Sequence, residues 1–289
     1  MRVDFHMMRT IIGFLRRLYR TLPSRPLRGI LAPVYYRYLT LRRQDKLVAA
    51  VDGITYEFDL RELIDSTIYY EGAWEPDTVA ALRRLIKPGQ TVLDIGANMG
   101  CHALLMAQLA GETGRVIAFE PMSAAYARLQ RNIRLNHFSN IVVEQIGLSD
   151  SAGQAEIAFA TSWRLDLKPG NVCIDKVTFV TLDRYVAAHP ELFHRLDCIK
   201  LDVDGFEELV LRGAQDTLQR HHPAILMEIG RDSMGAVRYL QAQNYSFFTE
   251  AGTEIRPDSI TTPETPGRRP TVNVIALPAR SDLPPEQTP

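Results

Sequence analysis

Short apolar runs alternate with longer segments of helical spacing along most of the chain. Residues 91–95 and 115–119 are apolar runs that predict buried strands, and residues 101–110 between them have the composition of a helix. Later parts of the chain repeat this order. Further strands are predicted over 141–145, 197–202, 224–228, 245–249 and 272–277, and further helices over 76–86, 123–136, 207–219 and 233–243, with another starting at Thr181. The alternation predicts an α/β fold around an open, largely parallel sheet, with the last two strands paired antiparallel.

The stretch 91–121 carries the first candidate chemistry. Gly96 and Gly100 bracket a turn after its first strand, so the backbone can lie close against a ligand. Glu120 ends its second strand, where an acid can accept hydrogen bonds from a ribose diol. The spacing lacks the G-x-G-x-x-G that favours the pyrophosphate of a dinucleotide, whereas S-adenosylmethionine (SAM) has no phosphate and fits; a plain structural turn is the alternative. Candidate cofactor-binding residues in this stretch are Asp94, Gly96, Ala97, Asn98, Gly100, His102, Glu120 and Pro121.

Acidic residues end the later strands as well. Asp202 and Glu228 each close an apolar run, and Asp150 follows the third strand, where it is a candidate for the adenine amino group or a turn-forming residue. Lys200 lies two residues before Asp202 and hence on the same strand face. It can keep that carboxylate ionised or form a structural ion pair with it. His102 is an alternative base.

Two hairpins and a loop flank these strands. Residues 47–60 predict a hairpin turning at Asp52-Gly53. Residues 155–160 and 177–180 predict a second hairpin, joined by an insertion over 161–176. Residues 68–75 are interpreted as a loop entering the cofactor strand, and Ser123 as the N-cap of the helix that it begins. The insertion and the loop are where we look for the acceptor, through Trp163, Tyr70, Trp74 and Arg164.

The composition is that of an ordinary soluble globular protein, with 46% hydrophobic and 23% charged residues. No apolar run approaches the roughly 18 residues of a membrane helix. Three scattered cysteines favour a reducing cytoplasm over a disulfide framework.

The net charge of -1 hides a strong asymmetry. Residues 1–46 hold eleven Lys or Arg against two acids, a charge of +9, so the remainder carries -10. The acidic body argues against a nucleic-acid substrate. Within the basic arm, Ile11, Leu15 and Leu18 recur at helical spacing, which predicts an amphipathic helix. This helix either lies on the inner face of an anionic membrane, or packs on the body or on the second subunit of a homodimer.

Four segments follow from these patterns. Residues 1–46 are a partly helical basic arm, and 47–90 are a hairpin and helix leading into the core. Residues 91–278 are the SAM-binding core. We expect a single domain from about Asp45 onward, and a disordered Pro-rich tail over 279–289.

Seven ordered motifs, lying between about residues 68 and 229, resemble those of the FkbM-type SAM-dependent methyltransferases. They are DIGANMG, AFEP, NIRLN, GLSD, VTLD, IKLDVDGFEELVLRGA and HPAILMEI. The chain departs from the family pattern at Leu201 and Asp204, where Ile and Glu are usual, and Cys101-His102 replaces a frequent aromatic pair.

This resemblance implies a Rossmann-like class I methyltransferase with a seven-stranded, mostly parallel sheet and helices on both faces, preceded by the helical arm and hairpin. It implies SAM across the ends of the first three strands, and methyl transfer to a hydroxyl of a sugar, glycolipid or polyketide-like small molecule. In that strand order, the ends bearing Asp94, Asp202 and Glu228 are neighbours. We therefore expect Asp202 to be the general base or the acceptor-positioning group, with Glu228 and Lys200 nearby and Asp204 and Glu207 orienting the site.

Three other interpretations stay open at this stage. The protein could be a non-catalytic SAM-fold module that docks to a membrane or partner. It could be a nicotinamide-dependent oxidoreductase, although the absent G-x-G-x-x-G disfavours that function. Asp202, Asp204 and Glu228 could also hold a divalent cation, although we expect no metal.

Overall fold

A computed structural model describes residues 46–160, 172–230, 233–261 and 271–279. The chain falls into two compact units, residues 1–74 with 160–172, and residues 75–159 with 173–289. The division at Trp74 differs from the single domain that we expected from about Asp45 onward. Residues 1–45 of the basic arm and residues 280–289 of the tail lie outside the described residues.

The described part of the first unit is a hairpin followed by a helix. β1 (Leu47–Val51) pairs antiparallel with β2 (Ile54–Phe58), as the turn sequence predicts. Asp52 and Gly53 have φ values of 54° and 79°. Two positive values in succession are what a primed turn requires, and they match the twist of the hairpin.

The helix α3 (Leu63–Glu71) replaces the first half of the loop that we predicted over residues 68–75, so that prediction was wrong for residues 68–71. Gly72 ends the helix in the left-handed conformation (φ 95°), and its N–H donates to the carbonyl of Ile68. The aromatic rings that suggested a loop pack inside this unit. Tyr69 meets Phe58 with ring centroids 5.6 Å apart and Tyr70 at 4.9 Å. Tyr70 is therefore only 7% exposed and does not offer its ring to an acceptor.

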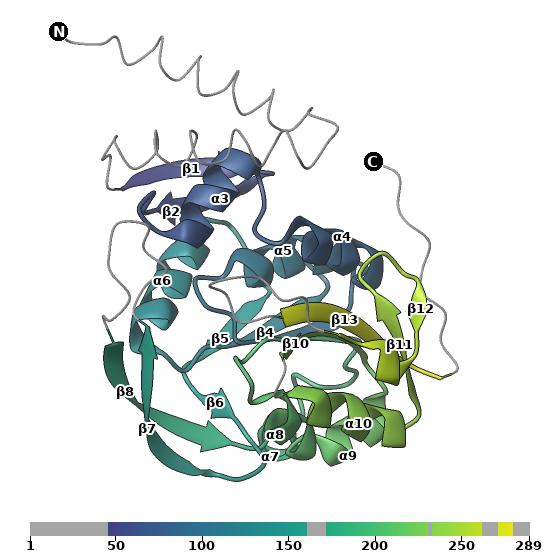
Figure 1. Cartoon of the computed structure of the whole chain (residues 1–289). Helices are drawn as coiled ribbons and strands as arrows, with labels where there is room; N and C mark the ends of the chain where they lie inside the picture. The colour runs from purple at the N-terminus through teal and green to yellow at the C-terminus, as the bar shows by residue number, and fades with distance from the viewer. Residues whose placement is uncertain (1–45, 161–171, 231–232, 262–270, 280–289) are drawn as a thin grey trace, which may run out of the picture. The chain divides into compact units, whose positions relative to one another are not determined.

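The second unit is built on one large sheet, with the strand order β12-β11-β13-β10-β9-β3-β4-β5 (Figure 1). Its strands are β3 (Thr91–Ile95), β4 (Arg115–Phe119), β5 (Ile141–Glu144), β9 (Cys198–Leu201), β10 (Ala224–Gly230), β11 (Tyr245–Thr249), β12 (Glu254–Ile255) and β13 (Thr271–Pro278). β13 runs antiparallel between β10 and β11, and the other long strands run parallel. Strand order and directions agree with the class I methyltransferase sheet, to which the short β12 adds an eighth strand.

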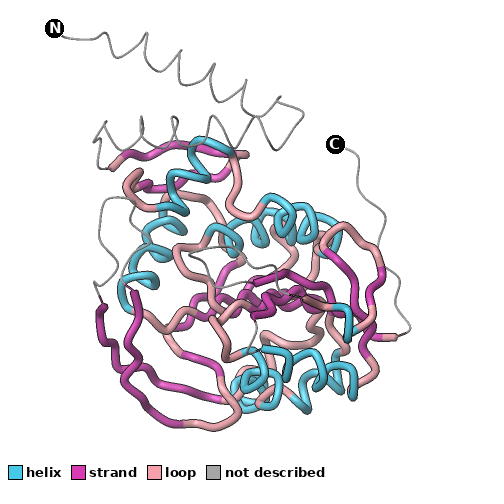
Figure 2. The backbone as a smooth tube through the Cα atoms, viewed as in Figure 1, coloured by secondary structure: helices cyan, strands magenta, loops and turns pink. Residues whose placement is uncertain are grey.

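Helices cover both faces of this sheet (Figure 2). They are α4 (Pro76–Leu85), α5 (Cys101–Ala110) and α6 (Ser123–Arg134) on one face, and α7 (Leu182–Ala188), α8 (Glu207–Arg212), α9 (Gln215–His221) and α10 (Met234–Ala242) on the other. Leu129 of α6 packs with Ala103 of α5 and Ala118 of β4. The first face thus has its own small apolar cluster.

The alternation of side chains along the strands decides which face receives the charged residues. Leu93, Ile199 and Met227 belong to the main core on the face of α7 to α10. Successive side chains of a strand point to opposite faces. The neighbouring residues Asp94, Lys200 and Glu228 therefore lie on the face of α4 and α5.

The predicted helix over 207–219 is in fact two helices, α8 and α9. The break falls at Gly213, where an added Cβ would lie 2.0 Å from the carbonyl oxygen of Ser149. The close approach of that backbone leaves no room for a continuous helix with a side chain here. Asp183 caps the second helix, because its carboxylate accepts the N–H groups of Asp216 and Thr217 at 3.0 and 2.8 Å.

The second hairpin forms part of a small sheet with the order β6-β8-β7. Its strands are β6 (Gly147–Leu148), β7 (Gly153–Ala160) and β8 (Val172–Val180), so β8 begins inside the predicted insertion. Asp175 of β8 accepts the N–H of Ser123 at 2.7 Å. Met122 rather than Ser123 holds the N-cap position of α6, which corrects our prediction. Trp163 and Arg164 lie outside the described residues.

Within the described ranges, no helix is long and apolar enough to cross a bilayer.

Candidate active site

The glycine turn after β3 lies directly against the end of β9. Gly96 has φ 86°, and the N–H groups of Gly96 and Ala97 both donate to the carbonyl of Phe119 at 3.0 Å. A Cβ on Gly96 would lie 1.8 Å from the backbone oxygen of Asp202. Only glycine satisfies both the left-handed conformation and this contact.

The far side of the turn is fixed by α6. Gly100 has φ 94°, and a Cβ there would lie 2.4 Å from Cδ1 of Leu129. Asn132, which is 1% exposed, donates from Nδ2 to the carbonyl of Met99 at 2.9 Å. We did not predict this contact, although Asn132 opens the NIRLN motif. The contact ties the loop to α6.

Glu120 joins the turn to the end of β4. Its carboxylate accepts the N–H of Asn98 at 2.7 Å and that of Met122 at 2.8 Å. Burial raises the pKa of Glu120 to about 7, against the lowering effect of these two hydrogen bonds. Each carboxylate oxygen can still accept a further hydrogen bond.

Lys200 connects two carboxylates from neighbouring strands. Its Nζ lies 3.5 Å from Oδ1 of Asp94 and 3.2 Å from Oδ2 of Asp202. Burial by itself lowers the pKa of Lys200, but Asp202 and Asp94 outweigh it and raise the pKa overall. The lysine therefore stays protonated, and it is the positive centre of the site.

Asp94 is the most buried of these acids, with no exposed surface. Burial raises its pKa, while Lys200 lowers it. Among the described residues, neither of its side-chain oxygens has a partner in hydrogen-bond geometry. A buried carboxylate with unused acceptor capacity is costly in a folded protein unless a ligand uses it.

Glu75 is a site residue that sequence reasoning missed. It sits at the N-cap of α4 with φ 49°, and its Oε2 lies 3.9 Å from Nε2 of His102. Burial and then the charge of Asp202 raise the pKa of Glu75 to about 7, while Lys200 lowers it. Glu75 closes the segment 68–75 in which we looked for the acceptor, but we did not name it as a site residue and interpreted its place before Pro76 as a helix start.

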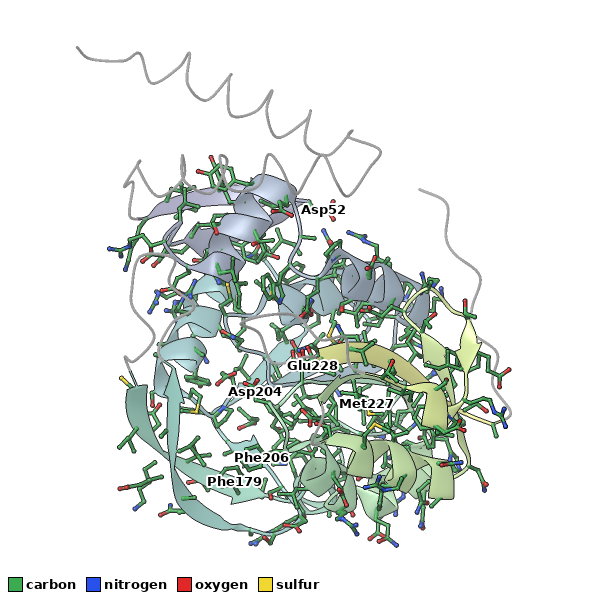
Figure 3. All side chains as sticks on the ribbon, viewed as in Figure 1. Asp52, Phe179, Asp204, Phe206, Met227 and Glu228 are labelled. Carbon is green, nitrogen blue, oxygen red and sulfur yellow. The ribbon has the colours of Figure 1, made fainter. Side chains whose placement is uncertain are left out.

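Glu228 faces the same cluster from β10. Burial and the charge of Asp202 raise its pKa to about 7, while a hydrogen bond from Thr271 lowers it. Asp204, labelled with Glu228 in Figure 3, adds a smaller upward effect. Asp204 itself is exposed and has φ 54°.

Glu207 acts on the loop that carries Asp204. It is 1% exposed, and its Oε1 accepts the N–H groups of Val203 and Gly205 at 3.1 Å each. Its Oε2 accepts the hydroxyl of Ser233 at 2.6 Å. The carboxylate thus ties the end of β9 to the start of α10.

Asp150 does not join this cluster. It is exposed and follows β6 in the small sheet, and its Cα lies close to the position of an added Cβ on Gly213 at the end of α8. The other acids lie at the ends of β3, β4, β9 and β10. Its role toward adenine stays a prediction.

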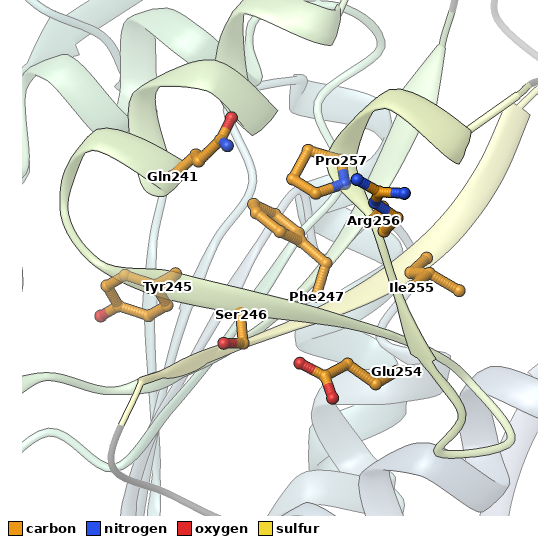
Figure 4. A pocket seen from close by; sticks show the side chains of 8 residues that line it. All are labelled: Gln241, Tyr245, Ser246, Phe247, Glu254, Ile255, Arg256 and Pro257. Carbon is orange, nitrogen blue, oxygen red and sulfur yellow. The ribbon is translucent and has the colours of Figure 1, made fainter.

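An open pocket of about 370 Å³ lies at the edge of the sheet formed by β11 and β12 (Figure 4). It is lined by Gln241, Tyr245, Ser246, Phe247, Glu254, Ile255, Arg256 and Pro257. Three strands separate β11 of this pocket from β3. We place the chemistry at the carboxylate cluster instead, because the perturbed acids and the glycine turn lie there. In the part of the chain that the structure describes, no three His, Cys, Asp or Glu side chains are arranged as a metal site.

This strand order, with a glycine turn after the first core strand and an acid at the end of the next, defines a class I methyltransferase. The family model described as the methyltransferase FkbM domain matches residues 94–254. The chain therefore belongs to the FkbM methyltransferase family, and its cofactor is SAM.

Curated relatives match over limited regions. "Methyltransferase 1" of Beauveria bassiana is 26% identical over 147 residues, which are 43% of this chain and 58% of that protein. A protein-L-isoaspartate O-methyltransferase of Methanococcoides burtonii is 36% identical over 70 residues, 24% of this chain and 34% of that protein. The aligned regions thus span less than two thirds of either relative. Among solved structures, the methyltransferase FkbM from Methylobacillus flagellatus is 16% identical with a TM-score of 0.44, covering 73% of this chain and 52% of that one.

The residues of the site fit this cofactor. Gly96 and Gly100 have positive φ, and the space that a Cβ would need is filled by the Asp202 backbone and by Leu129, so the turn holds a tight backbone against which a nucleoside could lie. Glu120 has acceptor capacity for a ribose diol, and Asp94 has capacity for a positively charged group.

Proposed function

We propose that this methyltransferase moves the methyl group of SAM to a hydroxyl oxygen of a small-molecule or glycan acceptor, such as a sugar, glycolipid or polyketide-like compound. The observation that carries the proposal is the group of carboxylates around Lys200, of which the Asp202 side chain is 31% exposed. A hydroxyl has to lose its proton during the transfer, and carboxylates can accept it. A neutral amine can attack without a base, and it would gain little from such a group.

SAM supplies an electrophilic methyl group on its sulfonium. The backbone of residues 96–100 and the Glu120 carboxylate would hold its nucleoside part, and Asp94 would face its positively charged end. The chain thereby fixes the donor, and alignment of this kind can lower a barrier by roughly 7 to 11 kcal/mol.

Asp202 and Glu228 have different roles toward the acceptor. Asp202 is held by Lys200 at 3.2 Å, which fixes its orientation, so it suits the positioning of a hydroxyl. Glu228 has a pKa of about 7 and suits proton acceptance near neutral pH. Glu207 supports both by holding the loop of residues 203–205.

Product analysis tests the proposal. Lysate fractions or a panel of hydroxyl-bearing glycans would be incubated with the protein and SAM carrying a deuterated methyl group. We expect a product heavier by the labelled methyl group, and its fragmentation should place that group on oxygen. A label found on nitrogen or carbon, or none on any acceptor above the level of the Asp202→Asn variant, would refute O-methylation.

We further infer that the basic arm brings the enzyme to an anionic membrane as a peripheral protein on the cytoplasmic side. The support is its charge of +9 over residues 1–46. Co-sedimentation of the full chain and of a chain lacking residues 1–45 with phosphatidylserine vesicles is the test. Equal recovery of the two proteins with the vesicles would refute the inference.

A further inference from the structure

Glu75 holds a backbone conformation that its neighbours disfavour. Its φ of 49° and ψ of 70° are left-handed, which L residues rarely adopt, and Pro76 follows it. Its side chain makes no hydrogen bond that caps α4. Strain of this kind, on the order of 1–3 kcal/mol, persists where surrounding structure enforces it and is common at ligand sites. The Glu75 carboxylate is hydrogen-bonded to Thr78 in the first turn of α4 and lies 3.9 Å from Nε2 of His102, so the conformation serves the helix start and also brings the carboxylate to α5.

The strand order places Glu75 relative to the nucleoside end of the site. Its carboxylate interacts with the charges of Lys200 and Asp202 on β9, and it lies 3.9 Å from His102 on α5. β9 borders β3 on one side, and β4 with Glu120 borders it on the other. A ligand whose ribose meets Glu120 and which crosses the end of β3 would have its opposite end beside Glu75.

The charges around that end are unbalanced. Three carboxylates, those of Asp202, Asp94 and Glu75, interact with one buried ammonium, that of Lys200. A fourth, Glu228, interacts with Asp202 and Glu75. Asp94 is fully buried; its Oδ1 is paired with Lys200 at 3.5 Å, and among the described residues neither oxygen has a partner that meets full hydrogen-bond geometry. A second cation with several N–H donors would satisfy both observations.

An α-amino acid fits this surrounding better than an isolated cation does. An ammonium group has three donors, whereas a sulfonium has none. The N-terminus of the ten-residue helix α5 begins at Cys101, next to His102, and unpaired N–H groups at a helix start favour a carboxylate. The acids can bind the ammonium of an amino acid, and the adjacent N-terminus of α5 can bind its carboxylate.

We propose that Glu75, together with Asp94, binds the α-ammonium group of the SAM methionyl end. The inference rests on the proposed function, because it assumes that the ribose meets Glu120. It makes Glu75 a cofactor-binding residue rather than the acceptor of the substrate proton.

Three ligands separate the contacts that Glu75 could make. SAM has the amino-acid end and the sulfonium, S-adenosylhomocysteine keeps the amino-acid end alone, and 5′-methylthioadenosine lacks both. Calorimetric titration of the full chain should show that Glu75→Gln weakens the first two roughly tenfold and leaves the third within about twofold. Asp77→Asn removes an exposed acid from the same turn of α4 and should leave all three affinities unchanged.

Every other result overturns the assignment. Equal weakening of all three ligands would make Glu75 a structural residue, and weakening of SAM alone would put its contact at the sulfonium. Unchanged affinities in Glu75→Gln would remove Glu75 from the cofactor site while leaving the proposed function standing. Failure of the wild-type chain to bind any of the three would instead refute the nucleoside site.

Discussion

Lys200 is the residue on which the two sides of the site depend. It is 4% exposed and lies between Asp94, on the cofactor side, and Asp202, on the acceptor side. Removing one partner of such a buried group leaves the others as uncompensated charges, at a cost of roughly 3–5 kcal/mol. The isosteric amide at Asp202 is therefore a better probe than alanine.

Asp202→Asn should reduce kcat by about 10²- to 10⁴-fold, because an amide cannot hold and orient a hydroxyl as a carboxylate does. The affinity for SAM should change by less than about threefold, since Asp94 and Glu120 are untouched. Steady-state kinetics and calorimetry on one preparation measure both quantities, with Asp258→Asn as the exposed control. Parallel loss of turnover and SAM affinity would move Asp202 to the cofactor side.

The proton acceptor should be visible in the pH dependence of the reaction. Glu228 has a pKa raised to about 7 by burial and by Asp202, Glu75 and Asp204, so below pH 7 it is protonated and cannot accept. We expect kcat to rise about tenfold per pH unit up to a limb near 7 and then to level off. Single-turnover rates from pH 5.5 to 8.5 measure this limb. If Glu228→Gln keeps the same limb, another group accepts the proton.

At the scale of elements, the glycine turn and the end of β9 share one contact. Gly96→Ala places a methyl group 1.8 Å from the Asp202 carbonyl and forces an L residue to φ 86°. We expect a loss of about 3 kcal/mol or more in unfolding free energy, together with loss of SAM binding.

Gly111→Ala is the matched control for Gly96→Ala. It has φ 66° and ψ 178° but nothing within 4 Å of its added Cβ, so it tests the conformational cost alone and should lose about 1–3 kcal/mol. Urea unfolding of both variants separates contact from conformation. Similar losses in the two would show that the contact with Asp202 adds nothing.

Elements with strong local patterns were predictable from the sequence. β3, α5 and β4 fall where the apolar periodicity put them, and Asp52-Gly53 fixed the first hairpin. The elements that we predicted wrongly depend on contacts with residues that are far away in the sequence. α3 is a helix because its rings pack on β2, and the helix over 207–219 breaks because Ser149 presses against Gly213.

The candidate site divides in the same way. Asp94, Lys200, Asp202 and Glu228 could be grouped from strand ends and strand order. Glu75 could not, because its part in the site depends on a left-handed turn that brings a helix start over the sheet. Asn132 and Thr271 act through single contacts to Met99 and Glu228, which local periodicity does not encode.

At the scale of the whole molecule, the buried acids couple cofactor binding to the release of protons. Glu75, Glu120 and Glu228 have pKa values raised to about 7, mainly by burial, from 4.5. A raised pKa stabilises the unliganded fold below pH 4.5, and this contribution is lost as the pH rises through 7. A positively charged ligand favours the ionised forms, so its binding releases protons.

SAM should consequently bind more tightly as the pH rises from 5.5 to 8, and it should raise the melting temperature more at pH 8 than at pH 6. Calorimetry at pH 6.5 in two buffers of different ionisation enthalpy counts the released protons, for which we expect a value between one and three. Proton uptake, or an affinity independent of pH, would contradict the charge balance derived for the site.

The contact between Gly96 and the Asp202 carbonyl also limits how this enzyme can be re-engineered. The nearest atoms at this contact are backbone atoms of Asp202, so trimming the Asp202 side chain does not change the spacing between the turn and the end of β9. Variants designed for bulkier donors or new acceptors would have to change residues that do not contact Gly96 or the Asp202 carbonyl, so that the distance between these two stays as it is. Libraries that randomise residues 94–100 and 200–205 should yield mostly unfolded proteins.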